Sequence, residues 1–239
     1  MKGIILAAGR GSRMGSLTND HPKCQTVIKG KKLIEWQFDA FKEAGIHEIS
    51  IVRGYMSGCF DYDLKYFENK RWKNTNMVVS LLTASEWLRS NVCIVSYSDI
   101  IYSSNTIDLL IKKDRDIVVA YDPNWEKIWK LRFEDPLSDA ESFKLDGEKI
   151  IEIGKKSVSI DSIEGQYMGI MKFTPEKWIE IENYLLSIDK RLLDCLDMTT
   201  LLQHLITNGM SIYASPVNDK WFEFDHQNDL DAFKNFDKI

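Results

Sequence analysis

Apolar residues along the chain fall into two kinds of run. Some are short and nearly continuous, as in Val92–Tyr97 and Ile117–Tyr121, and others recur every three or four positions, as in Leu33–Ala44. Continuous runs are typical of strands buried on both faces, and the longer period is typical of amphipathic helices. The first half therefore predicts strands at Lys2–Ala8, Glu48–Val52, Val92–Tyr97 and Ile117–Tyr121, and helices at Leu33–Ala44, Cys59–Phe67, Met77–Leu88 and Thr106–Lys113.

The second half changes character, because strand-like segments follow one another across short turns. Asp146-Gly147 is a typical hairpin turn between two of them. The pattern predicts strands at Glu141–Leu145, Lys149–Ile153, Gln166–Phe173, Ser211–Ser215 and Trp221–Phe224, and helices at Pro175–Ser187, Met198–Asn208 and Asn228–Phe236. Alternating strands and helices favour a parallel sheet with right-handed crossovers. We therefore predict one α/β, Rossmann-like domain over 1–239, with a mixed, mostly parallel central sheet flanked by helices.

Composition narrows the class of protein. The chain has 239 residues, 44% of them hydrophobic, and a net charge of −5, which argues against nucleic-acid binding. No apolar run reaches the roughly 20 residues of a membrane helix. The cysteines form no CxxC pair, which predicts reduced thiols and a cytoplasmic protein, and the scattered histidines make a zinc site unexpected. These cysteines are Cys24, Cys59, Cys93 and Cys195.

The segment Gly3–Lys23 carries the first candidate chemistry. The first predicted strand ends in Ala7-Ala8-Gly9, where small side chains allow a base or a phosphate to approach the backbone. Ligands of open α/β sheets bind beyond the carboxyl ends of the strands, and glycine-rich loops cradle phosphates there. Arg13 and Lys23 would neutralise a polyphosphate.

Two common phosphate-binding motifs do not fit this segment. Neither Gly9 nor Gly11 has the spacing of the G-x-x-x-x-G-K-[ST] loop. Met14 stands where the dinucleotide fingerprint needs its third glycine, and no suitable acid ends the second predicted strand.

The segment Leu6–Met14, with Leu17-Thr18 and Pro22-Lys23 after it, resembles the L-A-A-G-x-G-[ST]-R-[ML]…P-K signature of nucleotidyltransferases that make sugar and alcohol nucleotides. The resemblance implies catalytic roles for Arg13 and Lys23. It implies that the nucleotide is bound by Leu6, Ala7, Ala8, Gly9, Arg10, Gly11, Ser12, Arg13 and Lys23.

Acidic residues provide a candidate metal site. Asp99 follows a buried strand, and Glu223 and Asp225 alternate along a strand-like stretch, so their side chains share one face. Paired buried carboxylates are costly unless a cation is present, and Mg²⁺ prefers carboxylate and phosphate oxygens. The ending W-x-E-x-D…D-L is similar to that of phosphocholine cytidylyltransferases. This resemblance implies that Asp99, Glu223 and Asp225 hold Mg²⁺ and that Asp99 is catalytic.

Departures from the sugar-nucleotide pattern point to a different acceptor. Ser98-Asp99 replaces the usual Gly-Asp, and residues 75–84 resemble the T-N-N-x-x-S-L-x-x-A stretch of the cytidylyltransferases, with Met77 for the second Asn. Asn76, Ser80 and Ser98 join the expected nucleotide-binding residues on this basis. The whole chain looks most like cytidylyltransferases for phosphocholine, phosphonates or the phosphoglutamine of capsule modification.

The stretch from 125 to 167 is expected to bind the acceptor. Trp125 and Trp129 lie four apart on a predicted helical face, where core packing competes with a cation–π wall. Asp139 and Glu141 are interpreted as surface acids. The resemblance implies acceptor contacts from Arg132, Lys155, Lys156, Glu164, Gln166 and Tyr167, and Arg132 suits a phosphate clamp.

The expected function is Mg²⁺-dependent transfer of CMP from CTP to the phosphate or phosphonate of a small acceptor, for modification of a surface polysaccharide or lipid. Residues 1–122 would mainly bind the nucleotide, and 123–239 the acceptor and metal. A sugar-1-phosphate nucleotidyltransferase, a non-catalytic nucleotide sensor and a glycosyltransferase are the alternatives. The residues alone leave the base and the acceptor open, and a homodimer is compatible with the resemblance.

Overall fold

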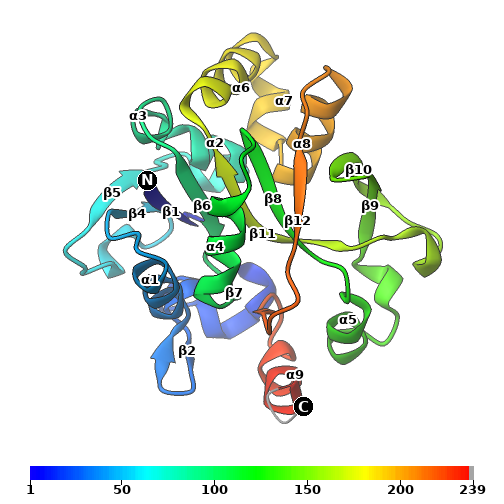
Figure 1. The fold of residues 1–239 in the computed structure, drawn as a ribbon. Helices are drawn as coiled ribbons and strands as arrows, with labels where there is room; N and C mark the ends of the chain where they lie inside the picture. Colours follow the sequence, from blue (N-terminus) through cyan, green and yellow to red (C-terminus); the bar gives the residue numbers. More distant parts are fainter. Residues whose placement is uncertain (237–239) are drawn as a thin grey trace.

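A nine-stranded sheet crosses the molecule in the order β5-β4-β1-β6-β11-β8-β12-β10-β9 (Figure 1). The structure is a computed structural model that describes residues 1–236. The strands of this sheet are β1 (Lys2–Ala7), β4 (Ile49–Arg53), β5 (Lys65–Glu68), β6 (Cys93–Tyr97), β8 (Ile117–Asp122), β9 (Glu141–Asp146), β10 (Lys149–Lys156), β11 (Gln166–Phe173) and β12 (Tyr213–Pro216).

The strand directions confirm a mixed, mostly parallel sheet. Strands β5, β4, β1 and β6 are parallel, and β8 and β12 form a second parallel pair. Strand β11 lies between these groups and is antiparallel to both β6 and β8. A strand of the second half of the chain is thus inserted between two strands of the first half. This interleaving joins both halves of the chain in one sheet.

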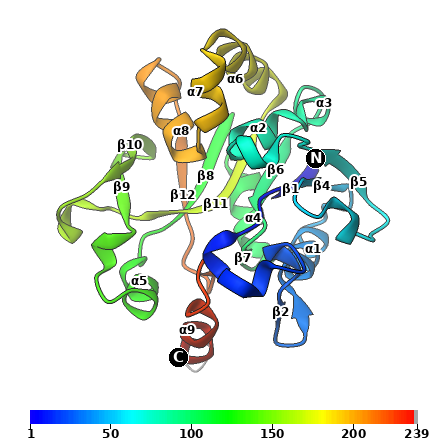
Figure 2. The ribbon, with the colours of Figure 1, turned by 180° about the vertical axis from the view of Figure 1, so that it is seen from behind.

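Helices cover both faces of the sheet. Helices α1 and α4 lie in front of it in Figure 1, and α2 and α8 lie in front of it in the reverse view of Figure 2. The helices are α1 (Leu33–Glu43), α2 (Met77–Leu82), α3 (Ser85–Leu88), α4 (Ser104–Lys112), α5 (Glu126–Arg132), α6 (Pro175–Ser187), α7 (Lys190–Cys195), α8 (Met198–Thr207) and α9 (Asp229–Phe236).

The continuous apolar runs are central strands, as their pattern predicts. Ile94 and Val95 of β6 and Val118 and Val119 of β8 have no exposed surface, because helices cover both faces of the sheet at these strands. Burial of each such side chain contributes on the order of 1.5–3 kcal/mol to folding. The centre of the sheet is therefore a rigid base for the loops at its edge.

Three local predictions differ from the structure. The segment Cys59–Phe67, expected to be a helix, is a loop that ends in edge strand β5. Pairing of β5 with β4 decides its conformation, because its alternating pattern buries Phe67 against the core. The expected helix Met77–Leu88 is divided by a turn at Thr83-Ala84 into α2 and α3, and helix α7 was not predicted.

Four short strands lie outside the main sheet. Strands β2 (Val27–Ile28) and β3 (Lys31–Lys32) form a hairpin. Strands β7 (Ile100–Ile101) and β13 (Phe222–Glu223) form an antiparallel pair in which Ile100 faces Glu223. The β7–β13 pair brings the end of the chain beside the turn that follows β6.

No helix within residues 1–236 has the length and apolar character needed to cross a membrane. Cys24, Cys59, Cys93 and Cys195 are free thiols. The prediction of a single domain over 1–239 stays a prediction, although the shared sheet supports it.

Gly169 allows β11 to bend beside the turn after β6. Its φ is +76°, and a Cβ atom there would lie 2.7 Å from Cδ2 of Tyr97. We expect Gly169→Ala to lower the free energy of unfolding by about 2–4 kcal/mol, from left-handed backbone strain plus the ring clash. The measurement is chemical denaturation at equilibrium.

Gly147→Ala is the matched control, since Gly147 has φ +58° and nothing within 4 Å of an added Cβ. It should cost only the backbone term, about 1–2 kcal/mol. Equal losses in the two variants would contradict the predicted contact with Tyr97.

Candidate active site

The glycine-rich loop starts where β1 ends and continues into a 3-10 turn over Ser12–Thr18. Gly11 has φ +72°, and a Cβ atom there would lie 2.6 Å from Cβ of Lys23. Glycine is needed at this position both for the backbone conformation and for the close approach of the lysine. The loop and Lys23 therefore pack together as one unit.

The side chain of Lys23 joins two acids that are distant in sequence. Its Nζ lies 2.5 Å from Oδ2 of Asp99 and 2.8 Å from Oδ1 of Asp225, and its side chain is only 9% exposed. Arg13 Nη2 donates to the same Asp225 oxygen at 2.9 Å. Burial acts to lower the pKa of Lys23, but the two carboxylates outweigh it and hold that pKa above its ordinary value. The lysine is therefore a fixed buried cation.

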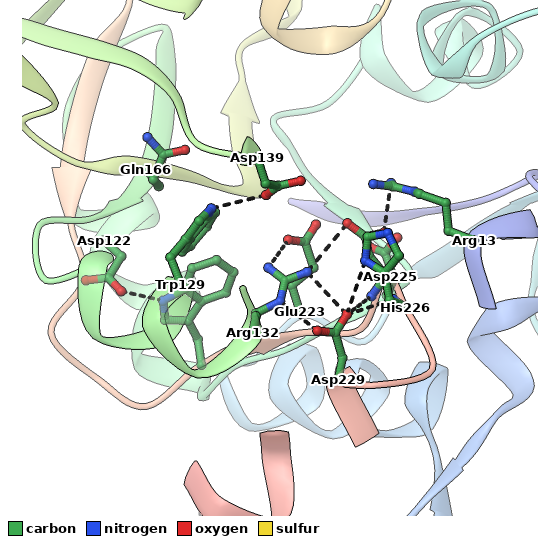
Figure 3. A network of polar contacts seen from close by, with 12 residues as sticks. Arg13, Asp122, Trp129, Arg132, Asp139, Gln166, Glu223, Asp225, His226 and Asp229 are labelled. Atoms are coloured by element: carbon green, nitrogen blue, oxygen red, sulfur yellow. Dashed lines mark hydrogen bonds and ion pairs between the residues drawn. The ribbon is translucent and has the colours of Figure 1, made fainter. Parts of the chain in front are cut away.

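A second set of ion pairs adjoins the first (Figure 3). The Arg132 side chain is fully buried, with Nη1 2.7 Å from Glu223 Oε2 and Nε 3.0 Å from Asp229 Oδ1. Asp229 also accepts hydrogen bonds from the backbone N–H groups of Asp225 and His226 at 2.7 Å each. Arg132 and Asp229 thus fix the segment that carries the two C-terminal acids.

The acids Glu223 and Asp225 respond differently to this setting. Burial and the neighbouring Asp225 raise the pKa of Glu223, although Arg132 opposes them. Burial also acts to raise the pKa of Asp225, but Lys23, Arg13 and Arg132 outweigh it and leave that pKa below its ordinary value. Asp225 is therefore the firmly ionised member of the pair.

Two cavities open on either side of this cluster and share Met77 and Tyr97. The first, of about 180 Å³, we call the loop cavity; it is lined by Leu6, Ala8, Gly9, Gly11, Lys23, Trp72, Thr75, Asn76, Met77, Ser80, Tyr97, Ser98 and Asp99. The second, of about 220 Å³, we call the acidic cavity. It is lined by Met77, Tyr97, Trp129, Asp139, Glu141, Ser142, Phe143, Ile153, Gln166, Tyr167, Gly169, Asp197, Met198, Thr199, Glu223 and Asp225.

The acidic cavity has a distinctive charge. Five carboxylates line it, and none of its lining residues is lysine or arginine. Burial raises the pKa of Asp139 and of Glu141, so neither is the surface acid that the sequence suggested. Aromatic rings complete the wall, with Tyr97 and Tyr167 in edge-on contact at 5.6 Å. Such a lining favours a positively charged group.

Most of the expected nucleotide-binding residues gather at the loop cavity. Its lining includes Leu6, Ala8, Gly9, Gly11, Lys23, Asn76, Ser80 and Ser98. Ala7, Arg10, Ser12 and Arg13 lie in the same segment but outside that lining. Arg10 Nη2 donates to Asn19 Oδ1 at 2.7 Å, and Arg13 contacts Asp225. The roles of all these residues stay predictions.

The expected acceptor-binding residues are divided. Gln166 and Tyr167 line the acidic cavity. The Arg132 side chain is paired with Glu223 and Asp229 and is not part of the cavity lining. Its position differs from the one expected for a clamp on the acceptor's phosphate. Lys155 pairs with Glu152 on the surface, and the three residues that remain outside both linings are Lys155, Lys156 and Glu164.

Sequence reasoning missed several residues of the acidic cavity. Asp197 caps helix α8 by accepting from Thr200 N at 2.8 Å, and Thr199 stands beside it. Asp197 was visible as a capping residue before an apolar run, but no pattern places that cap beside Glu141. Tyr97 was read only as the end of a buried strand.

The predicted metal ligands are brought together, with organic cations between them. Across residues 1–236, no group of three His, Cys, Asp or Glu side chains is arranged to hold a metal ion. Lys23 stands between Asp99 and Asp225, and Arg132 neutralises Glu223. Asp99 Oδ1 is nevertheless buried with no partner in the described part of the chain. This unpaired carboxylate oxygen fits a divalent cation, whereas Glu223 and Asp225 would have to exchange their organic cations for it.

Comparisons with known proteins agree with this geometry. A family model described as the MobA-like NTP transferase domain matches residues 3–152. The chain is 36% identical to the CTP:phosphoglutamine cytidylyltransferase of Campylobacter jejuni, over 97% of this chain and 98% of that one. It is also 36% identical to the choline-phosphate cytidylyltransferase of Streptococcus pneumoniae, over 39% of this chain and 43% of the relative. A third relative, the 2-aminoethylphosphonate cytidylyltransferase of Lancefieldella rimae, is 32% identical over 44% of this chain and 45% of the relative.

Solved structures show the same fold. The inositol-1-phosphate CTP transferase from T. maritima superposes with a TM-score of 0.77 at 18% identity, covering 99% of this chain and 96% of that one. The family model spans more than half of the chain, and the first relative spans nearly all of it. The chain therefore belongs to the MobA-like NTP transferase family, which confirms the nucleotidyltransferase resemblance of its glycine-rich segment.

Proposed function

We propose that this protein transfers CMP from CTP to the phosphate or phosphonate of a small acceptor that carries an amino or quaternary ammonium group. The observation that carries the proposal is the position of Lys23, Asp99 and Asp225 between the two cavities. A nucleotide in the loop cavity and an acceptor in the acidic cavity would meet there. The relative that matches nearly the whole chain is named for CTP and phosphoglutamine.

The loop cavity suits the nucleotide. Small residues at Ala8 and Gly9 leave room for a flat base, and Asn76 and Ser80 offer an amide and a hydroxyl group. Backbone N–H groups of a glycine-rich loop can bind phosphate oxygens, and Lys23 adds a fixed positive charge. CTP, rather than another nucleotide, is supported by the names of three relatives, all of them cytidylyltransferases.

The acidic cavity suits an ammonium-bearing acceptor better than a sugar. Its carboxylates attract a cation, and its rings can contact a quaternary ammonium. Three relatives are named for phosphoglutamine, choline phosphate and 2-aminoethylphosphonate. Each of these compounds carries a positively charged nitrogen, which is a quaternary ammonium in choline phosphate and an amino group in the other two. The charge of the cavity thus agrees with the names of the relatives.

The reaction needs no protein nucleophile. An oxygen of the acceptor's phosphate or phosphonate attacks the α-phosphorus of CTP and forms the new P–O bond. The bond from that phosphorus to the bridging oxygen breaks in line, and pyrophosphate leaves with the electron pair. Lys23 and Arg13 would stabilise the anionic phosphates. Holding two mutually repelling anions in this geometry can supply about 7–11 kcal/mol of the barrier reduction.

We further propose that Asp99, Glu223 and Asp225 hold Mg²⁺ when substrates are bound. A bound divalent cation would supply neutralisation of phosphate charge at the reacting centre. Lys23 would then leave one of its two carboxylate partners for a phosphate oxygen. The cytoplasmic location, a homodimer and a role in capsule polysaccharide synthesis, all expected from the sequence, remain proposals.

The function is tested by measuring pyrophosphate release with Mg²⁺, from each of CTP, UTP, dTTP and ATP against a panel of acceptors. We expect CTP to react with phosphoglutamine, phosphocholine or 2-aminoethylphosphonate at least about 100-fold faster, by kcat/KM, than with glucose 1-phosphate. A preference for glucose 1-phosphate would contradict the acceptor class, and a preference for another nucleotide would contradict the donor.

Replacing Lys23 by alanine tests the centre of the site. The change removes the cation between Asp99 and Asp225, so we expect kcat to fall about 100-fold or more. Circular dichroism checks that the fold survives. Lys177→Ala is the control, because Lys177 lies on α6, lines neither cavity and forms an ion pair with Glu180 of the same helix. A Lys23→Ala enzyme with near-normal turnover would refute the role assigned to the lysine.

Neutralising the acidic cavity should weaken acceptor binding alone. Asp197→Asn removes one negative charge from the cavity and keeps a residue that can cap α8. Glu141→Gln removes one negative charge at the start of β9. We expect each to raise KM for an ammonium-bearing acceptor about tenfold while KM for CTP changes less than about threefold. Asp146→Asn, an exposed acid of the same strand as Glu141, is the matched control. Unchanged acceptor KM values would contradict the proposed subsite.

A further inference from the structure

A buried glutamine of helix α1 lies behind the turn that carries Asp99. Gln37 has no exposed surface, and its Nε2 donates to the carbonyl oxygens of Tyr97 at 2.8 Å and of Ile100 at 2.9 Å. These two carbonyls stand immediately before and after Ser98-Asp99. One amide group therefore spans the base of the turn.

The surroundings of this amide are polar and buried. Ser96 Oγ also donates to the Tyr97 carbonyl at 2.9 Å, and it accepts from the Tyr102 hydroxyl at 3.0 Å. The other end of the amide, Gln37 Oε1, is buried and has no partner within residues 1–236. Burying an unpaired carbonyl oxygen costs free energy. The site thus uses the two N–H donors of Gln37 and leaves its oxygen unsatisfied.

The opposite side of the turn is also held. The Phe224 N–H donates to the Asp99 carbonyl at 2.9 Å, and β13 pairs with β7 directly after the turn. Gln37 fixes the turn to helix α1, and β13 fixes it to the segment that carries Glu223 and Asp225. From this turn the Asp99 carboxylate reaches Lys23, with its Oδ2 2.5 Å from the lysine Nζ.

From this geometry we infer that Gln37 is a positioning residue for Asp99. Gln37 is not among the residues that line either cavity, so it acts through the turn and not on a substrate. The inference rests on the proposed function in so far as Asp99 acts in nucleotidyl transfer. Loss of both donors leaves the Ile100 carbonyl without its side-chain partner and frees the turn to shift. A displacement of about 1 Å at a reacting group can lower the rate about 100-fold.

The test variant is Gln37→Met, which matches the length of glutamine and removes both donors. We expect kcat to fall about 10- to 100-fold while KM for CTP changes less than about threefold, because the loop cavity keeps its lining. Gln37→Glu can donate one hydrogen bond when its buried carboxyl is protonated, so its kcat should lie between those of Gln37→Met and the natural enzyme. If Gln37→Met does not fold, Gln37→Glu replaces it in the kinetic measurement and in the crystal structure described below.

Phe41→Leu is the matched control, since Phe41 is fully buried on the same helix and contacts Gly3 instead of the turn. A Gln37→Met enzyme whose kcat stays within about threefold of the natural value overturns the inference. A fall no larger than that of Phe41→Leu at the same loss of Tm also overturns it.

Crystal structures of the natural protein and Gln37→Met give a readout independent of activity. We expect the contact between Lys23 Nζ and Asp99 Oδ2 to be lost or lengthened in the variant, and an unchanged contact overturns the inference. If the natural protein transfers no nucleotidyl group, the proposed function fails, but this comparison still decides whether Gln37 positions Asp99.

Discussion

The site depends on one buried cation, the ammonium group of Lys23, held between the carboxylates of Asp99 and Asp225. Lys23 and Asp225 are 202 positions apart in the chain, and both side chains are almost entirely buried. A buried charge is tolerated only when it is paired, and removing one partner costs several kcal/mol. Each member of the cluster therefore constrains the others. The fold must bring the N-terminal loop, the end of β6 and the segment after β13 to a single point.

Two features of the fold achieve this convergence. Strand β11 is inserted between β6 and β8, which makes the two halves of the chain share one sheet and places a cavity on each side of the cluster. The β7–β13 pair then sets the register of Glu223 against the turn that carries Asp99. Arg132 and Gln37 stabilise these two acidic segments from behind. The charged groups are thus held in place by side chains that do not line either cavity.

The sequence predicted much of this arrangement because part of it is local. Apolar runs identified the central strands, and the segment Leu6–Met14 identified the loop and the family. What depends on contacts between distant segments could not be predicted. Periodicity cannot show that β5 pairs at the sheet edge. It also cannot show what Gln37 contacts: this polar residue shares a helix face with Leu33 and Phe41, and its partners are backbone carbonyls about sixty positions away. Arg132 was expected to clamp a phosphate because its acidic partners are distant in sequence: Glu223 is 91 positions away and Asp229 is 97.

The most direct test of the account is a crystal structure with Mg²⁺, a non-hydrolysable CTP analogue and an ammonium-bearing phosphate acceptor. The account predicts the cytosine beside Ala8 and Asn76, the ammonium group in the acidic cavity, and the α-phosphate next to Lys23 where the two ligands meet. It would be contradicted by a nucleotide bound in the acidic cavity, or by two ligands that bind without approaching Lys23 and Asp99.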